Sequence, residues 1–268
     1  MTEQKQDLLV SLENGIKRIT FNRPTRRNSV NAEMMPQMLA AFRESTTDGT
    51  RVVILTGAGD SFCAGADLNA TNERDIANFN ITDALREGVN PIILAMRELS
   101  APVIARVHGH AVGVGFNYAL ACDLIIASEQ ALFGQVFVKI GLMPDGGSTN
   151  FLPRLVGYHK AFELAALGDI IKADEALRLG IVNKVVPFDE LDKTVDDAAR
   201  RFLQLPQVAL AKIKAGLNFG MNADLSAALE FEAVNQDACY HSPDFNEGVT
   251  AFLEKRKPNF NQNSNSND

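Results

Sequence analysis

Three glycine-bearing turns hold most of the groups in this 268-residue chain that could do chemistry. They span residues 62–68 (FCAGADL), 108–115 (HGHAVGVG) and 141–147 (GLMPDGG), and the third carries one carboxylate, Asp145. Such turns can aim backbone N–H groups at a substrate oxygen. A pair of N–H groups with one carboxylate can move a proton next to a carbonyl group. The same set is poorly suited to adding water.

The composition narrows the class of protein. With 46% hydrophobic residues, the chain can bury one substantial core or two modest ones. The net charge of −7, with both signs interspersed, argues against nucleic-acid binding. No apolar run approaches the roughly 18 residues of a membrane helix, and the polar residues 1–7 indicate no secretory signal. Cys63, Cys122 and Cys239 are odd in number and widely spaced, so they predict neither disulfides nor a metal site but a reducing, cytoplasmic compartment.

The elements that must position these turns follow an α/β rhythm. Alternating runs at residues 8–12 and 16–21, around Asn14-Gly15, predict a β-hairpin. Asn31 is expected to cap a helix to about residue 46, although Pro36 blurs its start. Further strands are expected at residues 52–56, 103–107, 123–127 and 131–133, a helix at residues 116–122, and another ending at Glu98 with a kink or restart at Pro91. Strand, turn, helix and strand in repetition predict an α/β core.

The C-terminal part is predicted to be mostly helical from about residue 146. Apolar residues share helical faces at Leu210, Ile213 and Leu217, and again at Phe245, Val249, Phe252 and Leu253. Pro206 and Pro243 fit first helical positions. The polar residues 69–82 are expected to be mobile and to shape the acyl pocket, and the Asn/Ser-rich residues 259–268 to be a disordered tail.

The turn at Gly113 has two readings on its own residues. Gly113-Val114-Gly115 could hold a phosphate at a helix N-terminus, or it could be a tight packing turn. The dinucleotide fingerprint would need a further glycine where Tyr118 stands, so a nicotinamide-dependent oxidoreductase is disfavoured.

Taken in order along residues 8–260, the motifs resemble the crotonase, or enoyl-CoA hydratase/isomerase, superfamily. Each motif alone is weak, but the ordered set is specific. The residues that carry the resemblance are 22–28, 62–68, 109–119, 122–123, 133–134, 141–147, 247–249 and 252–258.

The resemblance implies a repeated ββα spiral core over residues 1–200 and a helical trimerisation region over residues 201–258. It also implies an acyl-CoA thioester substrate with no separate cofactor. The backbone N–H groups of Ala64 and Val114 would form an oxyanion hole that stabilises a thioester enolate. Neighbouring residues expected to line the substrate are Gly65, Ala66, Asp67, Leu68 and Gly113, with Asp67 holding the turn or capping a helix.

The carboxylates distinguish reactions within this superfamily. The two glutamates with which its hydratases activate water fall at Asn117 and Phe137 here, and neither side chain can take a proton. Asp145 falls where several isomerases carry an acid, and its surroundings are most similar to the ring-epoxide isomerase of phenylacetate degradation. We therefore expect Asp145 to shuttle one proton, Asn117 to orient the substrate, and Phe137 to keep the pocket dry. Burial would raise the pKa of Asp145.

Basic residues complete the expected substrate site. By resemblance, Arg26 and Arg27 would face the CoA, and Lys255, beside Arg256 and Lys257, would reach the CoA phosphate of a neighbouring subunit. A homotrimer or a dimer of trimers is expected. No metal site is expected, because His108 and His110 lack further ligands nearby.

Three alternatives stay open. The chain could be a hydratase that holds water with Asn117 and Asp145, or it could rearrange a ring. It could also bind acyl-CoA without catalysis. In that case Asp145 would be only a turn residue, since Pro-Asp-Gly is favourable turn chemistry.

Overall fold

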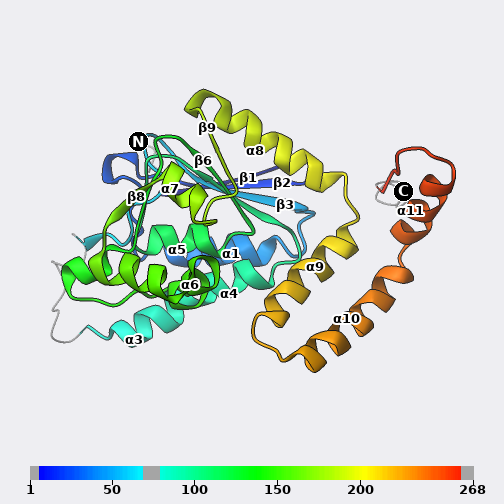
Figure 1. Ribbon diagram of the computed structural model, residues 1–268. Coiled ribbons are helices and arrows are strands. Elements are labelled where there is room, and N and C mark those ends of the chain that lie inside the picture. The colour runs from blue at the N-terminus through cyan, green and yellow to red at the C-terminus, as the bar shows by residue number, and fades with distance from the viewer. Residues whose placement is uncertain (1–5, 69–78, 261–268) are drawn as a thin grey trace.

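The computed structural model describes residues 6–68 and 79–260, and it shows a sheet covered by helices on both faces with a helical extension at the C-terminus (Figure 1). The main sheet has the order β1-β2-β3-β4-β6-β9, and a small sheet has the order β5-β7-β8. The strands are β1 (Leu8–Glu13), β2 (Ile16–Phe21), β3 (Val52–Gly57), β4 (Val103–Val107), β5 (His110–Val112), β6 (Leu124–Ser128), β7 (Leu132–Gly134), β8 (Ile170–Lys172) and β9 (Lys184–Val186).

The helices follow the strands in a regular alternation until β9. They are η1 (Pro24–Arg26), α1 (Met34–Glu44), α3 (Ile81–Ala84), the π-helical turn η3 (Leu85–Val89), α4 (Asn90–Glu98), α5 (Val114–Ala121), η4 (Val136–Ile140), α6 (Ser148–Leu167), α7 (Ala173–Arg178), α8 (Phe188–Leu203), α9 (Gln207–Gly220), α10 (Leu225–Tyr240) and α11 (Pro243–Leu253).

The ββα repeat expected from the sequence is present. The chain places β4 in the main sheet and β5 in the small one before it enters α5, and it does the same with β6, β7 and the following helices. Isolated bridges between Val30 and Ala66 and between Cys63 and Ala111 extend the small sheet toward the N-terminal part of the chain. The glycine turns therefore lie where each repeat leaves the small sheet.

The strand β3 shows why both faces of the main sheet are apolar. The side chains of Val52 and Ile54 pack in the cluster under α8, and those of Val53 and Leu55 pack in the larger cluster under α1, α4 and α5. Successive strand residues point to opposite faces, so a parallel strand covered on both sides needs a continuous apolar run.

Helix boundaries follow local chemistry. Asn31 accepts a hydrogen bond from the Met34 N–H at 3.0 Å, but α1 begins at Met34 and its cap residue is Glu33, two residues later than the expected Asn31. Pro91 lies in the first turn of α4 directly after η3, so the helix restarts there, since proline has no N–H to donate. Pro243 begins α11 as expected, whereas Pro206 precedes the first residue of α9 by one position.

The helix α9 is anchored to the core by a buried lysine. Lys214 donates to the Met96 carbonyl at 2.9 Å, to the Ala101 carbonyl at 3.2 Å and to the Asp123 carboxylate at 2.7 Å. Beyond α9, helices α10 and α11 extend away from the core (Figure 1).

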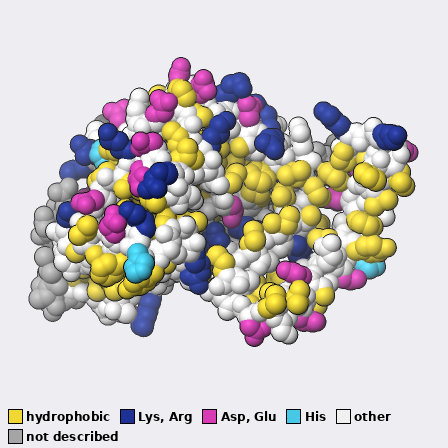
Figure 2. Space-filling model, in the orientation of Figure 1, with side chains coloured by type: hydrophobic (Ala, Val, Ile, Leu, Met, Phe, Trp, Pro, Cys, Tyr) yellow, Lys and Arg dark blue, Asp and Glu magenta, His cyan; other side chains and the backbone are white. Residues whose placement is uncertain are grey.

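The extension α9–α11 carries many exposed apolar side chains, which are visible in Figure 2. The largest exposures are those of Leu217, Leu225, Phe252 and Leu253, at 67–81%. Of the expected tail, residues 261–268 lie outside the described part of the chain, and so do residues 69–78 of the expected mobile segment. Within residues 6–68 and 79–260, no helix is long and apolar enough to cross a membrane.

Candidate active site

Asp145 lies on a turn that is held against α5. The Asn117 Nδ2 donates to the Asp145 carbonyl at 2.9 Å, and the Ser148 N–H donates to the same carbonyl at 3.0 Å. Gly146 has φ +52°, and a Cβ there would lie 3.2 Å from the Asn117 Cβ. Glycine is needed at this point because the turn adopts a left-handed conformation while it approaches α5 closely.

The Asp145 carboxyl is half-buried, and its Oδ1 is buried with no hydrogen-bond partner among the described residues. Burial raises the pKa of Asp145 to about 6, and the nearby Asn117 amide and Asp145 N–H act against this rise. A carboxyl group with such a pKa can both take and return a proton near neutral pH. This is the property expected of a proton shuttle.

The raised pKa of Asp145 predicts that Asp145→Asn stabilises the fold. Because the pKa is raised from 3.8 to about 6 on folding, stability is lost as pH rises through about 6. Asparagine removes that loss. Allowing for the partial exposure of the carboxyl, we expect about 1–2 kcal/mol of extra stability at about pH 8 and little at about pH 4. Urea unfolding across this pH range is the measurement, and a gain independent of pH would contradict the prediction.

The two other glycine turns meet each other. A Cβ on Gly113 would lie 3.8 Å from the Gly65 Cα, and a Cβ on Gly65 would lie 3.0 Å from the Val112 carbonyl. Val114 is the first residue of α5, so its N–H has no acceptor within the helix, and none of the described residues accepts from it. The turn therefore presents the Val114 N–H as a free donor.

The free N–H group opposite Val114 belongs to Ala66 and not to Ala64. The Ala64 N–H donates to the Arg27 carbonyl at 3.0 Å, so it cannot serve an oxyanion. The Gly65 carbonyl accepts from Val30, and no described residue accepts a hydrogen bond from the Ala66 N–H. Ala66 follows Gly65 as Val114 follows Gly113, so the free donors follow the two glycines that face each other.

The segment before α1 braces the turn at residues 62–68. Arg23 pairs with Asp67 at 2.8 Å, and this confirms that Asp67 holds the turn. Arg27 and Asn28 both have left-handed φ angles, +48° and +58°. Asn28 is fully buried, accepts from the Arg23 N–H at 2.9 Å, and donates to the carbonyls of Ala58 at 2.8 Å and Ser61 at 2.6 Å.

Asn28→Ala is expected to destabilise the protein by about 2–4 kcal/mol. The change leaves the buried backbone groups that bond to Asn28 without partners, and it removes a residue that tolerates the left-handed conformation. The urea midpoint measures this. Thr25→Ala, an exposed change in η1, is the control and should be nearly neutral. Equal stability of the Asn28 and Thr25 variants would contradict the role of Asn28 in holding the turn at residues 62–68.

The remaining predicted site residues divide into two groups. Asn117 and Phe137 are buried beside the turns, and a Cβ on Gly113 would lie 4.0 Å from the Phe137 Cζ. By contrast, Arg26, Arg27, Leu68 and Lys255 are exposed. Lys255 lies beyond α11, so the C-terminal extension separates it from α5 in the same chain (Figure 1).

The histidines near Gly109 have structural partners. His108 is buried and contacts the Arg106 guanidinium at 2.8 Å and the Gly59 carbonyl at 2.8 Å. Burial, with the Arg106 charge, holds the pKa of His108 below its usual value. His110 lies 3.4 Å from the Ser61 hydroxyl. Both histidines therefore have contacts within the chain that support the turn.

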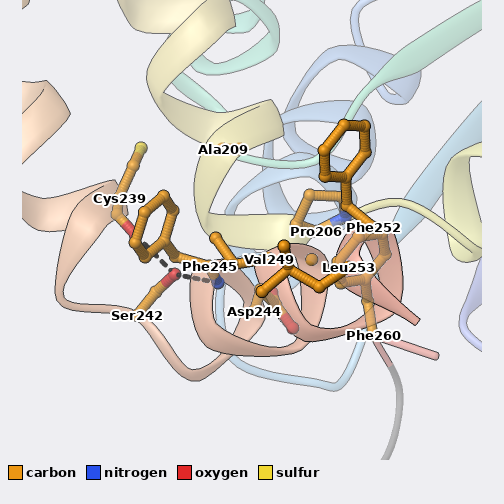
Figure 3. A pocket seen from close by; sticks show the side chains of 11 residues that line it. Pro206, Ala209, Cys239, Ser242, Asp244, Phe245, Val249, Phe252, Leu253 and Phe260 are labelled. Carbon is orange, nitrogen blue, oxygen red and sulfur yellow. Dashed lines mark hydrogen bonds between the residues drawn. The ribbon is translucent and has the colours of Figure 1, made fainter. Parts of the chain in front are cut away.

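An apolar cavity of about 360 Å³ lies in the C-terminal extension (Figure 3). It is formed between the start of α9, the end of α10 and α11, with Phe260 on one side. Figure 3 shows Phe245, Val249 and Leu253 on its wall. Its lining residues include none of Asp145, Asn117 and Val114.

The sequence profile of the enoyl-CoA hydratase/isomerase family matches residues 11–263. The chain belongs to this family. The resemblance inferred from the ordered motifs, and the crotonase-type fold, are therefore confirmed.

Relatives within the enoyl-CoA hydratase/isomerase family carry different activities in their names. A 1,2-epoxyphenylacetyl-CoA isomerase of Escherichia coli is 37% identical, with 94% of this chain and 97% of the relative covered. A crotonyl-CoA hydratase of Syntrophomonas wolfei is 39% identical, with 95% and 98% covered. The crystal structure of an enoyl-CoA hydratase from Mycobacterium smegmatis has a TM-score of 0.90 at 32% identity and covers 95% of this chain and 99% of that one. Family membership alone therefore does not determine which reaction this chain catalyses.

Sequence reasoning missed two residues of this site. Ala66 was expected only to line the substrate, yet its N–H is free. Gln135 was not singled out, although it is buried and hydrogen-bonded to Asn117. The roles of both residues depend on which backbone and amide groups are already hydrogen-bonded. Tertiary contacts determine that pairing.

Proposed function

We propose that this chain is an acyl-CoA isomerase that shifts a double bond through a thioester enolate. The observation that carries the proposal is the half-buried Asp145, with raised pKa and unpaired Oδ1, beside the non-ionisable Asn117 and Phe137. One carboxylate is sufficient for a proton shuttle, whereas water addition by the family's usual route needs acid–base groups at the other two positions.

The mechanism needs no water. The Asp145 carboxylate takes a proton from C2 of a β,γ-unsaturated thioester, and the electron pair moves onto the thioester oxygen. The N–H groups of Ala66 and Val114 stabilise this enolate. The carboxylic acid then returns the proton to C4 while the double bond moves between C2 and C3. Phe137 excludes water from this exchange.

The expected CoA contacts belong to the same proposal. Arg26 and Arg27 are exposed beside the Ala66 turn and would meet the CoA phosphates. Lys255 would meet the CoA of a neighbouring subunit. Exposed apolar side chains along α9–α11 support a homotrimer, alone or paired into a hexamer. Light scattering after size exclusion should give three or six chains, and a monomer would contradict this part.

The reaction is tested by product mass. The protein is incubated with a 3-enoyl-CoA and, separately, with a 2-enoyl-CoA in ¹⁸O-labelled water. Conversion of the 3-enoyl thioester to its 2-enoyl isomer is expected, with unchanged mass and with the two isomers separated by chromatography before the mass is read. Gain of labelled water by the 2-enoyl thioester would establish a hydratase instead. No change with either would leave a ring substrate or a non-catalytic binding role.

A further inference from the structure

Gln135 is a buried polar residue that the proposed mechanism does not use. It lies between β7 and η4 with 1% of its surface exposed. Its Nε2 donates to the Asn117 Oδ1 at 2.7 Å. Asn117 is itself fully buried, and its Nδ2 donates to the Asp145 carbonyl at 2.9 Å. Two consecutive hydrogen bonds thus connect Gln135 to the Asp145 turn.

We propose that Gln135 is a positioning residue for the reaction, which fixes the amide orientation of Asn117 and thereby holds the Asp145 turn against α5. This inference rests on the proposed role of Asp145 as proton shuttle.

The direction of these hydrogen bonds is the reason for the assignment. An asparagine amide can turn over, which exchanges its acceptor for its donor with almost no change of shape. With the opposite orientation, the Asn117 Oδ1 would face the Asp145 carbonyl, and two acceptors would repel. The Gln135 donor favours the observed orientation because it places the Asn117 oxygen on its own side, while the Gln135 Oε1 is buried with no partner among the described residues.

The turn itself depends on this tether. Gly146 and Gly147, with φ +52° and +82°, follow Asp145 directly and have the widest conformational freedom of any residue. The Asp145 carbonyl is held by Asn117 and by the adjacent Ser148 N–H. Ser148 begins α6 directly after the turn, so of these two contacts only the one from Asn117 ties the turn to α5, and its loss would let the carboxyl move outward into water.

The test is Gln135→Met, which keeps the length of the side chain and removes the donor. We expect kcat to fall about 10-fold, with the dissociation constant for the thioester within about twofold of the parent value. The acidic limb of the pH profile should move to lower pH, because a carboxyl that is less buried ionises more readily. Gln130→Met, an exposed change before β7, is the matched control and should be silent.

A double-mutant cycle separates positioning from a general loss of structure. In an Asn117→Ala background, Gln135→Met should cost less than about twofold, because the bond it supports is already absent. Gln135→Leu, which also removes the donor and has a different shape, serves if the methionine variant fails to fold. It should show the same loss of kcat.

The inference fails if kcat and the pH profile of the Gln135 variants match the parent, or if the loss is the same in the Asn117→Ala background. Failure of the proposed function would give a different result, because full activity of Asp145→Asn would rule out Asp145 as the proton shuttle. An inactive Asp145→Asn protein with normal Gln135 variants would overturn only the positioning role.

Discussion

Asp145→Asn is expected to lower kcat for double-bond migration by about 10³-fold or more, near the upper end of the effects seen on removing a general acid–base. Asparagine keeps the shape of the side chain but can neither take the C2 proton nor return it to C4. The dissociation constant for a CoA thioester, measured by calorimetry, should change little, because the substitution leaves the backbone N–H donors unchanged.

The control for this change is Asp169→Asn, which removes an exposed carboxylate on the loop before β8. Its kcat should equal that of the parent. An Asp145→Asn protein that keeps its fold and most of its activity would show that another group moves the proton. The residue that moves the proton would then have to be identified again.

Val114→Pro is expected to lower kcat by about 10²–10³-fold, the usual effect of removing one oxyanion donor. Proline is well tolerated at the first residue of a helix, where the N–H is not used by the helix. Val114 has this position in α5, so the substitution deletes the donor and leaves the helix intact. Single-turnover kinetics with a 3-enoyl-CoA measure the loss.

Val114→Ala, which keeps the N–H and shortens the side chain, is the matched control and should stay within several-fold of the parent. Circular dichroism establishes that both variants are folded. A Val114→Pro enzyme as fast as Val114→Ala would mean that this N–H does not face the thioester oxygen. The free N–H of Ala66 would then have no partner donor in the proposed hole.

Much of the fold could be predicted from periodicity and turn chemistry. The hairpin around Asn14-Gly15 and the strands β3 and β4 follow from alternating or continuous apolar runs. The helix restart at Pro91 follows from the missing N–H of proline. These features depend on local sequence, and so they could be read without tertiary contacts.

The N–H of Ala64, which is the donor expected from the sequence, is already paired in the structure for a physical reason. The motif fixes the approximate position of the turn, but the pairing of each N–H depends on a distant segment. Ala64 is used by Arg27, whose left-handed conformation brings its carbonyl into reach. Gly65, with φ +99°, then reorients the chain before Ala66. No property of the turn at residues 62–68 alone distinguishes the two donors.

The position of Asp145 depends both on local turn residues and on a tertiary contact. Pro144, Gly146 and Gly147 predict a turn around it, but the position of that turn against α5 depends on the hydrogen bond from Asn117, 28 residues earlier. That contact also explains why Gln135 was missed, because its partner lies in another element of the spiral.

Transfer of a labelled proton tests the central claim most directly. A 3-enoyl-CoA carrying deuterium at C2 is converted under single-turnover conditions in ordinary water, and the position of the label in the product is read by mass spectrometry. A single shuttle in a pocket that excludes water predicts that a measurable fraction of deuterium appears at C4. Product with no deuterium at C4, even at the shortest times, would contradict the account.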